Sequence, residues 1–134
     1  AGRSRVKSAV WAALMLASGA VQAVGADWQT VSDTPEALIA IDAGSVERMA
    51  DRVRFRERQS IRIAELDAAT LRPVREVLEK RLIDCRAARI ATLSRAVFSD
   101  DDAMIDHRAV WPDRAVWQPV LRSDPRFRLL CGRG

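Results

Sequence analysis

The alternation of arginine with apolar residues over residues 53–63 constrains the fold more than any other feature of the sequence. In this segment, VRFRERQSIRI, one set of alternate residues includes the apolar side chains Val53, Phe55, Ile61 and Ile63. The other set of alternate residues consists of Ser60 and the arginines Arg54, Arg56, Arg58 and Arg62. Side chains alternate between the two faces of a strand, whereas a helix would spread these arginines around its axis. We predict a half-buried antiparallel strand, in which Glu57 and Gln59 on the apolar face indicate a bulge or a polar spot.

Further strands are predicted on both sides of this segment. Residues 27–33, anchored by Trp28, and residues 37–42 have strand character and are separated by the breaker Thr34-Pro35. Residues 89–98 are rich in β-branched and aromatic side chains, and a polar turn at 99–102 lets residues 103–110 return as a partner strand. The composition of residues 76–85 suits a helix as well as a strand.

A short helix is predicted near the C-terminus. Ser123 or Asp124 can cap its first turn, where Pro125 is also favoured. Gly132 suits the stop, because glycine adopts the positive φ angles at which helices often end. The last turn of this helix then carries Cys131.

Residues 1–26 have the layout of a secretory signal peptide. A basic stretch precedes the apolar run of residues 9–17, and small residues occupy the −3 and −1 positions of cleavage sites after Ala23 and Ala26. The run is shorter than the roughly 20 residues that span a bilayer, and no second run follows, so no transmembrane segment is expected. We therefore expect an exported protein with residues 27–134 as a single domain.

The charge balance of the predicted domain is close to neutral. The predicted signal peptide, residues 1–26, holds three of the 22 basic residues and none of the 18 acidic ones. Its removal therefore lowers the formal net charge from +4 to +1. A nucleic-acid partner is not expected, because domains that bind nucleic acids carry a marked excess of basic residues.

Both cysteines, Cys85 and Cys131, lie in the predicted domain. In an oxidising compartment an even pair of cysteines indicates a structural disulfide. A redox pair normally has Cys-x-x-Cys spacing, and a zinc site needs more ligands than these two and the single histidine, His107. We predict a structural disulfide, with no metal and no cofactor.

The order of these pieces resembles the surface-adhesin protein E family of Gram-negative bacteria. The matching motifs are Asp84-Cys85, the run Trp117-Gln118-Pro119-Val120, and a terminal helix ending in Cys131. The resemblance implies an α+β fold, in which an antiparallel β-sheet of about six strands holds a short C-terminal helix through the disulfide. It favours a strand over residues 76–85. It also implies a location in the periplasm or on the cell surface.

The name-giving member of that family binds host matrix and serum proteins and forms dimers. For this chain the resemblance therefore implies a protein, matrix or glycan partner and a homodimer. The candidate binding residues are Arg54, Arg56, Arg58, Arg62 and Trp111. An arginine-lined strand face suits an anionic partner, such as a sulfated glycan or a lipid head group. The alternative is a solvated face whose arginines pair with carboxylates such as Glu76 or Glu79.

The two tryptophans of the C-terminal third are interpreted differently. Trp111 is a candidate contact because tryptophan is enriched at binding hot spots. Trp117 is expected to seal the helix against the sheet.

The sequence contains no complete catalytic constellation. Asp106-His107 suggests a general base, but no serine, cysteine or second histidine is placed to complete a triad. The run 100–102 of three aspartates lacks the spacing of a calcium-binding loop and is interpreted as a turn. We therefore predict an adhesin-like binding module and not an enzyme. The alternative function is a small periplasmic enzyme or an enzyme inhibitor.

The leader generates the first testable prediction. Export should be followed by cleavage after Ala26 or, less favoured, after Ala23, because both sites have small residues at −3 and −1. The new terminus should carry no lipid, since the residue directly after each site is Val24 or Asp27 and not a cysteine. N-terminal sequencing and the intact mass of the exported protein measure this. An uncleaved or acylated terminus would contradict the prediction.

Overall fold

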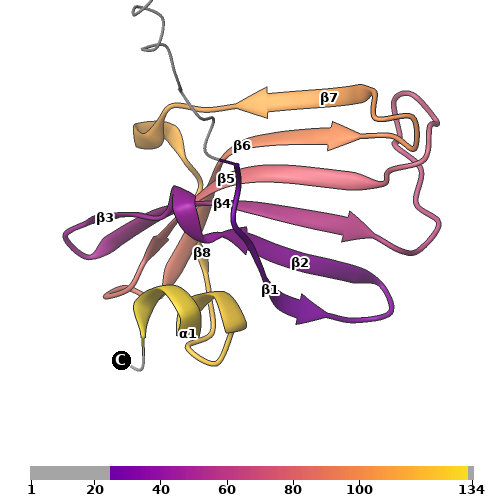
Figure 1. Cartoon of the computed structure of the whole chain (residues 1–134). Helices are drawn as coiled ribbons and strands as arrows, with labels where there is room; N and C mark the ends of the chain where they lie inside the picture. The colour runs from indigo at the N-terminus through magenta and orange to yellow at the C-terminus, as the bar shows by residue number, and fades with distance from the viewer. Residues whose placement is uncertain (1–24, 133–134) are drawn as a thin grey trace, which may run out of the picture.

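A computed structural model describes residues 25–132, which form one antiparallel sheet and one short α-helix (Figure 1). The predicted signal peptide falls almost wholly on residues 1–24, which lie outside the described residues. The strands are β1 (Trp28–Asp33), β2 (Ala37–Asp42), β3 (Glu47–Met49), β4 (Arg52–Ile61), β5 (Glu76–Asp84), β6 (Arg89–Phe98), β7 (Met104–Ala109) and β8 (Gln118–Pro119). The helix is α1 (Pro125–Cys131), and two 3₁₀ turns are η2 (Ala43–Ser45) and η3 (Pro112–Arg114).

Six of the strands follow one another across the sheet in the order β1-β2-β4-β5-β6-β7. Figure 1 shows β1 and β7 as the two outer strands of this path. The short strands β3 and β8 pair only with β4 and β6, respectively. The predicted sheet of about six strands and the strand at residues 76–85 are confirmed. The sequence did not reveal β3 and β8, because segments of two or three residues carry no readable periodicity.

Strand β4 differs from its prediction at one end. It stops at Ile61, so Arg62 and Ile63 lie in the connection to β5, and Ile63 is 46% exposed. The register against β5 runs without interruption from Arg52–Asp84 to Ser60–Glu76. The polar residues on the inner side of β4 are therefore a polar spot and not a bulge.

Alternation along the strands gives the sheet one covered face and one open face. On the covered face, the main apolar cluster joins Phe55 of β4 and Ile83 of β5 to Phe127 and Leu130 of α1. A second, smaller cluster lies under the β4–β5 connection and consists of Val74, Val77 and Val97. We call this side the helix face, and the opposite side, which carries the β4 arginines, the open face.

Helix α1 is capped at its first turn and is tied to the sheet at its last turn. Asp124 caps it, because its Oδ1 accepts a hydrogen bond from the Arg126 backbone N–H at 2.8 Å. At the other end Arg48 of β3 donates to the Leu130 carbonyl at 2.6 Å, and the Cys85–Cys131 disulfide joins the last turn to the end of β5. Gly132 ends the helix at φ 74° and ψ −160°, a region that only glycine adopts readily. The predicted disulfide, cap and stop are confirmed.

The disulfide generates the second prediction. Cys131→Ser should lower the melting temperature by more than about 10 °C, because a bridge across 46 positions contributes about 4 kcal/mol in the chain-entropy model. The helix has seven residues, and isolated helices below about 12 residues are not stable in water. Thermal unfolding followed by circular dichroism measures the loss. The double variant Cys85→Ser/Cys131→Ser should match the single one, and an unchanged midpoint would refute a stabilising bridge.

Candidate functional site

Four arginines stand in one row on the open face. They alternate along β4 and lie opposite Asp84, Leu82, Lys80 and Leu78 of β5, in the order Arg52, Arg54, Arg56 and Arg58. We call these four residues the arginine ridge. Strand alternation places neighbouring members about 6.6–6.8 Å apart along the chain. The predicted face is therefore present, and Arg52 extends it by one position beyond the predicted start of the strand.

Carboxylates neutralise only part of the ridge. Arg52 lies 3.7 Å from Asp84, and Arg56 lies 3.6 Å from Asp42. Within the described residues 25–132, no carboxylate comes within 4.0 Å of the other two ridge members, Arg54 and Arg58. The expected pairing with Glu76 or Glu79 is wrong, since the ridge finds its acidic partners elsewhere and Glu79 points to the helix face. Two of the four ridge arginines therefore carry a positive charge that no carboxylate of the described residues neutralises.

Two tryptophan rings support the ridge. The guanidinium of Arg58 lies 4.6 Å from the centroid of the Trp28 ring, and that of Arg56 lies 5.6 Å from it. Arg52 lies 4.9 Å from the Trp117 ring. Such cation–π contacts hold an arginine side chain in place while leaving its N–H groups available. Trp117 thus packs on an arginine of the open face, and the prediction that it seals the helix is wrong.

The other two candidate residues lie apart from the ridge. Arg62 is in the β4–β5 connection, where its Nη1 lies 2.5 Å from Asp33 Oδ1 and donates to the Thr34 carbonyl at 2.9 Å. It is therefore committed to an internal ion pair and is not on the strand face. Trp111 immediately precedes η3 and is 77% exposed, so its ring is available to a partner.

The acidic and histidine candidates show no catalytic arrangement. Asp106 lies 3.4 Å from Arg108 Nε, and His107 is exposed. Asp101 of the predicted turn lies 2.5 Å from Arg72. In the described part of the chain no cluster of three or more histidine, cysteine or acidic residues is placed to hold a metal ion. Over the same residues, no helix has the length and apolar character needed to cross a membrane.

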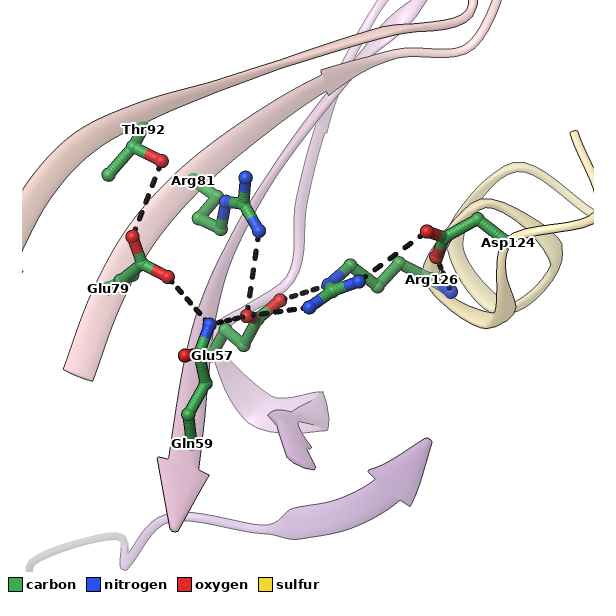
Figure 2. A network of polar contacts seen from close by, with 7 residues as sticks. All are labelled: Glu57, Gln59, Glu79, Arg81, Thr92, Asp124 and Arg126. Atoms are coloured by element: carbon green, nitrogen blue, oxygen red, sulfur yellow. Dashed lines mark hydrogen bonds and ion pairs between the residues drawn. The ribbon is translucent and has the colours of Figure 1, made fainter. Parts of the chain in front are cut away.

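A buried polar network lies on the helix face of the sheet and reaches α1 (Figure 2). At its centre Glu57 is fully buried. Arg126 of α1 binds it with two nitrogens, Nε to Oε1 and Nη2 to Oε2, the second at 3.0 Å. Gln59 donates to Glu57 Oε2 at 2.7 Å, and Arg81 Nη1 lies 3.5 Å from the same oxygen. The network therefore joins the helix to the middle of the sheet.

The network extends to a second carboxylate. Glu79 of β5 lies directly opposite Glu57 in the register. Gln59 Nε2 bridges the two carboxylates, since it also donates to Glu79 Oε1 at 2.9 Å. Thr92 Oγ1 donates to Glu79 Oε2 at 3.4 Å. Figure 2 shows this chain of contacts running from β6 across the sheet to α1.

The surroundings shift the pKa values of the two glutamates in opposite directions. Burial alone would raise the pKa of Glu57, but the hydrogen bonds and charge of Arg126 and the charge of Arg81 outweigh it and lower that pKa. For Glu79, burial outweighs the charge of Arg81, and its pKa is raised. Arg126 is held charged, with a raised pKa, because its bonds to Glu57 outweigh its own burial. Glu57 is therefore a fixed anion that neutralises the helix arginine.

This arrangement generates the third prediction. Glu57→Gln should destabilise the fold by about 1.5–3 kcal/mol at pH 7, because it removes the charged bonds from Arg126 and leaves this guanidinium only the longer contact to Asp124 at 3.5 Å. A lowered folded-state pKa means that the contribution of Glu57 is complete above the unfolded pKa, about 4.3, and is lost as the pH falls through the folded pKa. Urea unfolding of both proteins between pH 7 and pH 3 should show the difference shrinking in acid.

Glu79→Gln is the matched control, because it changes the same group on the facing strand. The raised pKa of Glu79 means that its ionised form costs stability at neutral pH and that this cost disappears as the pH falls through the folded pKa. The variant should therefore be at least as stable as the wild type at pH 7 and should lose that advantage in acid. Equal and pH-independent losses in both variants would contradict the assigned roles.

Two solved structures of Haemophilus influenzae protein E are similar to this chain. One has 12% sequence identity and a TM-score of 0.49, and the match covers 72% of this chain and 80% of that chain. The other has 11% identity and a TM-score of 0.48, covering 77% of this chain and 71% of that chain. No family model matches the sequence, and no curated protein does. The similarity agrees with the resemblance that the sequence motifs indicate, and it concerns the fold alone.

Proposed function

We propose that this domain is an exported, non-catalytic binding module whose arginine ridge takes an extended anionic partner, such as a sulfated matrix glycan. The observation that carries this proposal is the pair Arg54 and Arg58, two ridge members that have no carboxylate partner within the described residues. Both sit in a row with two further arginines on the open face. A linear polyanion that follows β4 can therefore contact several guanidinium groups at once.

The restrained conformation of the ridge arginines favours a surface that binds a partner over one that is only solvated. Exposed ion pairs usually contribute little, partly because two long side chains must be immobilised to form them. On the ridge, Trp28 and Trp117 already restrain three of the four arginines. An arriving anion then pays less conformational entropy, which is how preorganisation raises affinity. Planar guanidinium groups also match sulfate and carboxylate oxygens through paired hydrogen bonds.

The buried carboxylates argue against the enzyme alternative. Catalytic acids and bases are often recognised by shifted pKa values, and Glu57 and Glu79 are the facing pair with such shifts. Both are buried, and their oxygens bind Arg126, Gln59 and Thr92. A substrate would have to displace helix α1 to reach them. We therefore assign the pair to the structure of the domain.

Export is the second part of the proposal. The Cys85–Cys131 disulfide supports it, because such bonds persist in oxidising compartments and are rare in the cytosol. An arginine-rich face on an envelope protein can meet anionic polymers of the surroundings directly. We place the domain in the periplasm or on the cell surface of a Gram-negative bacterium, in agreement with the leader sequence.

The ridge generates the fourth prediction. Arg54→Ala together with Arg58→Ala should abolish retention on a heparin resin at physiological salt, because both guanidinium groups without an internal carboxylate are lost. The variant should stay folded, because neither substitution breaks an ion pair among the described residues, but its melting temperature should fall somewhat with the loss of the Arg58–Trp28 contact. Elution by a salt gradient measures the retention, and wild-type elution should depend steeply on salt because exposed charges are screened.

The matched control is Arg75→Ala together with Arg128→Ala. These two exposed arginines lie off the ridge, and their removal causes the same change in net charge. Retention of this control should resemble that of the wild type. If both double variants elute alike, net charge alone controls retention and the ridge has no specific role.

A further inference from the structure

A hollow opens on the open face between the arginine ridge and the edge strand β7. Its volume is about 790 Å³. Toward β4 it is lined by Arg54, Arg56 and Lys80, and toward β7 its lining is largely apolar. The apolar part consists chiefly of Leu78, Ala96, Phe98, Met104 and Trp111. The hollow thus combines a cationic side with an apolar side.

The polar groups of the hollow leave one donor without a partner. Arg54 Nε is buried and has no hydrogen-bond partner within the described residues. Nε itself is covered, so an anion in the hollow would contact the outer end of the Arg54 guanidinium, which forms no ion pair within the described residues. Glu79 is the one carboxylate in the lining, but it is not the anionic partner of Arg54. Its oxygens accept hydrogen bonds from Gln59 and Thr92 on the helix face.

The size and lining of the hollow favour a small molecule over a polymer. Small-molecule sites usually enclose about 300–1,000 Å³ and combine mostly apolar walls with a few polar groups that orient the ligand. A linear polyanion has no apolar part to place over Phe98 and Trp111. A molecule with an anionic head and a long apolar chain matches both sides.

We propose that this hollow binds a long-chain anionic amphiphile, whose chain lies over Leu78, Phe98 and Trp111 and whose head group contacts Arg54 and Lys80. This site goes beyond the proposed function, because the polymer needs the ridge and not the apolar wall. It shares Arg54 with the ridge, so the two ligands should compete. Trp111, which is exposed without a ligand, supplies the aromatic wall of the site.

The experiment is calorimetric titration of the purified protein with laurate, below the concentration at which laurate forms micelles. Wild type should bind with a stoichiometry of one, and Trp111→Ser should weaken binding about tenfold or more, as expected when an aromatic hot spot is lost. Ala96→Trp should block binding by filling the floor of the hollow. Leu121→Ser is the matched control, since Leu121 is 75% exposed and lies outside the hollow.

The uncharged amphiphile dodecyl maltoside tests the role of the anionic head and should bind at least about tenfold more weakly than laurate, the loss expected when a charge-assisted contact of about 1.4 kcal/mol is missing. Retention on heparin should be unchanged in Trp111→Ser. Heparin retention therefore tests the arginine ridge and laurate titration tests the hollow, so one proposal can fail while the other holds. The amphiphile site is refuted if wild type does not bind laurate, if Leu121→Ser weakens binding as much as Trp111→Ser, or if charged and uncharged amphiphiles bind alike.

Discussion

The ion pair between Glu57 and Arg126 is the contact on which the helix face depends. Residue 57 lies in the middle of the central strand β4, and residue 126 lies in the first turn of α1. Together with the disulfide at the other end of the helix, the pair fixes a seven-residue element that cannot persist alone. Phe127 and Leu130 are thereby held against the sheet, and the main apolar cluster is closed.

Because α1 covers the helix face, the binding surface that we propose is the open face. The apolar clusters under α1 and the β4–β5 connection both lie on the same side of the sheet. The other side is shielded mainly by long arginine stems and tryptophan rings. Arginine is suited to this double role, since its methylene stem covers apolar surface while its charged end stays in water. The same side chains that protect the open face can therefore form its contacts with a ligand.

Alternation and turn chemistry predicted most of the fold. The parity of residues 53–63 identified the central strand and its arginine face, and the cap and stop residues identified α1. The partner of Glu57 could not be predicted, because Arg126 lies 69 residues away and only the folded chain brings them together. The positions of Trp28 and Trp117 on the open face were missed for a related reason. Aromatic side chains suit a core as well as an arginine-stacked surface, and strand parity alone does not decide between them.

The position of α1 at the end of the described domain also has a consequence for the timing of folding. The groups that close the core, from Arg126 to Cys131, are made after all eight strands. A nascent chain that lacks them has no Arg126 to pair with Glu57, no second cysteine and an uncovered apolar cluster. The sheet therefore cannot reach its final stability before α1 has been synthesised. Until α1 is in place, Phe55 and Ile83 lack their apolar covering, so a chain that stops before residue 125 loses the closed core together with the helix.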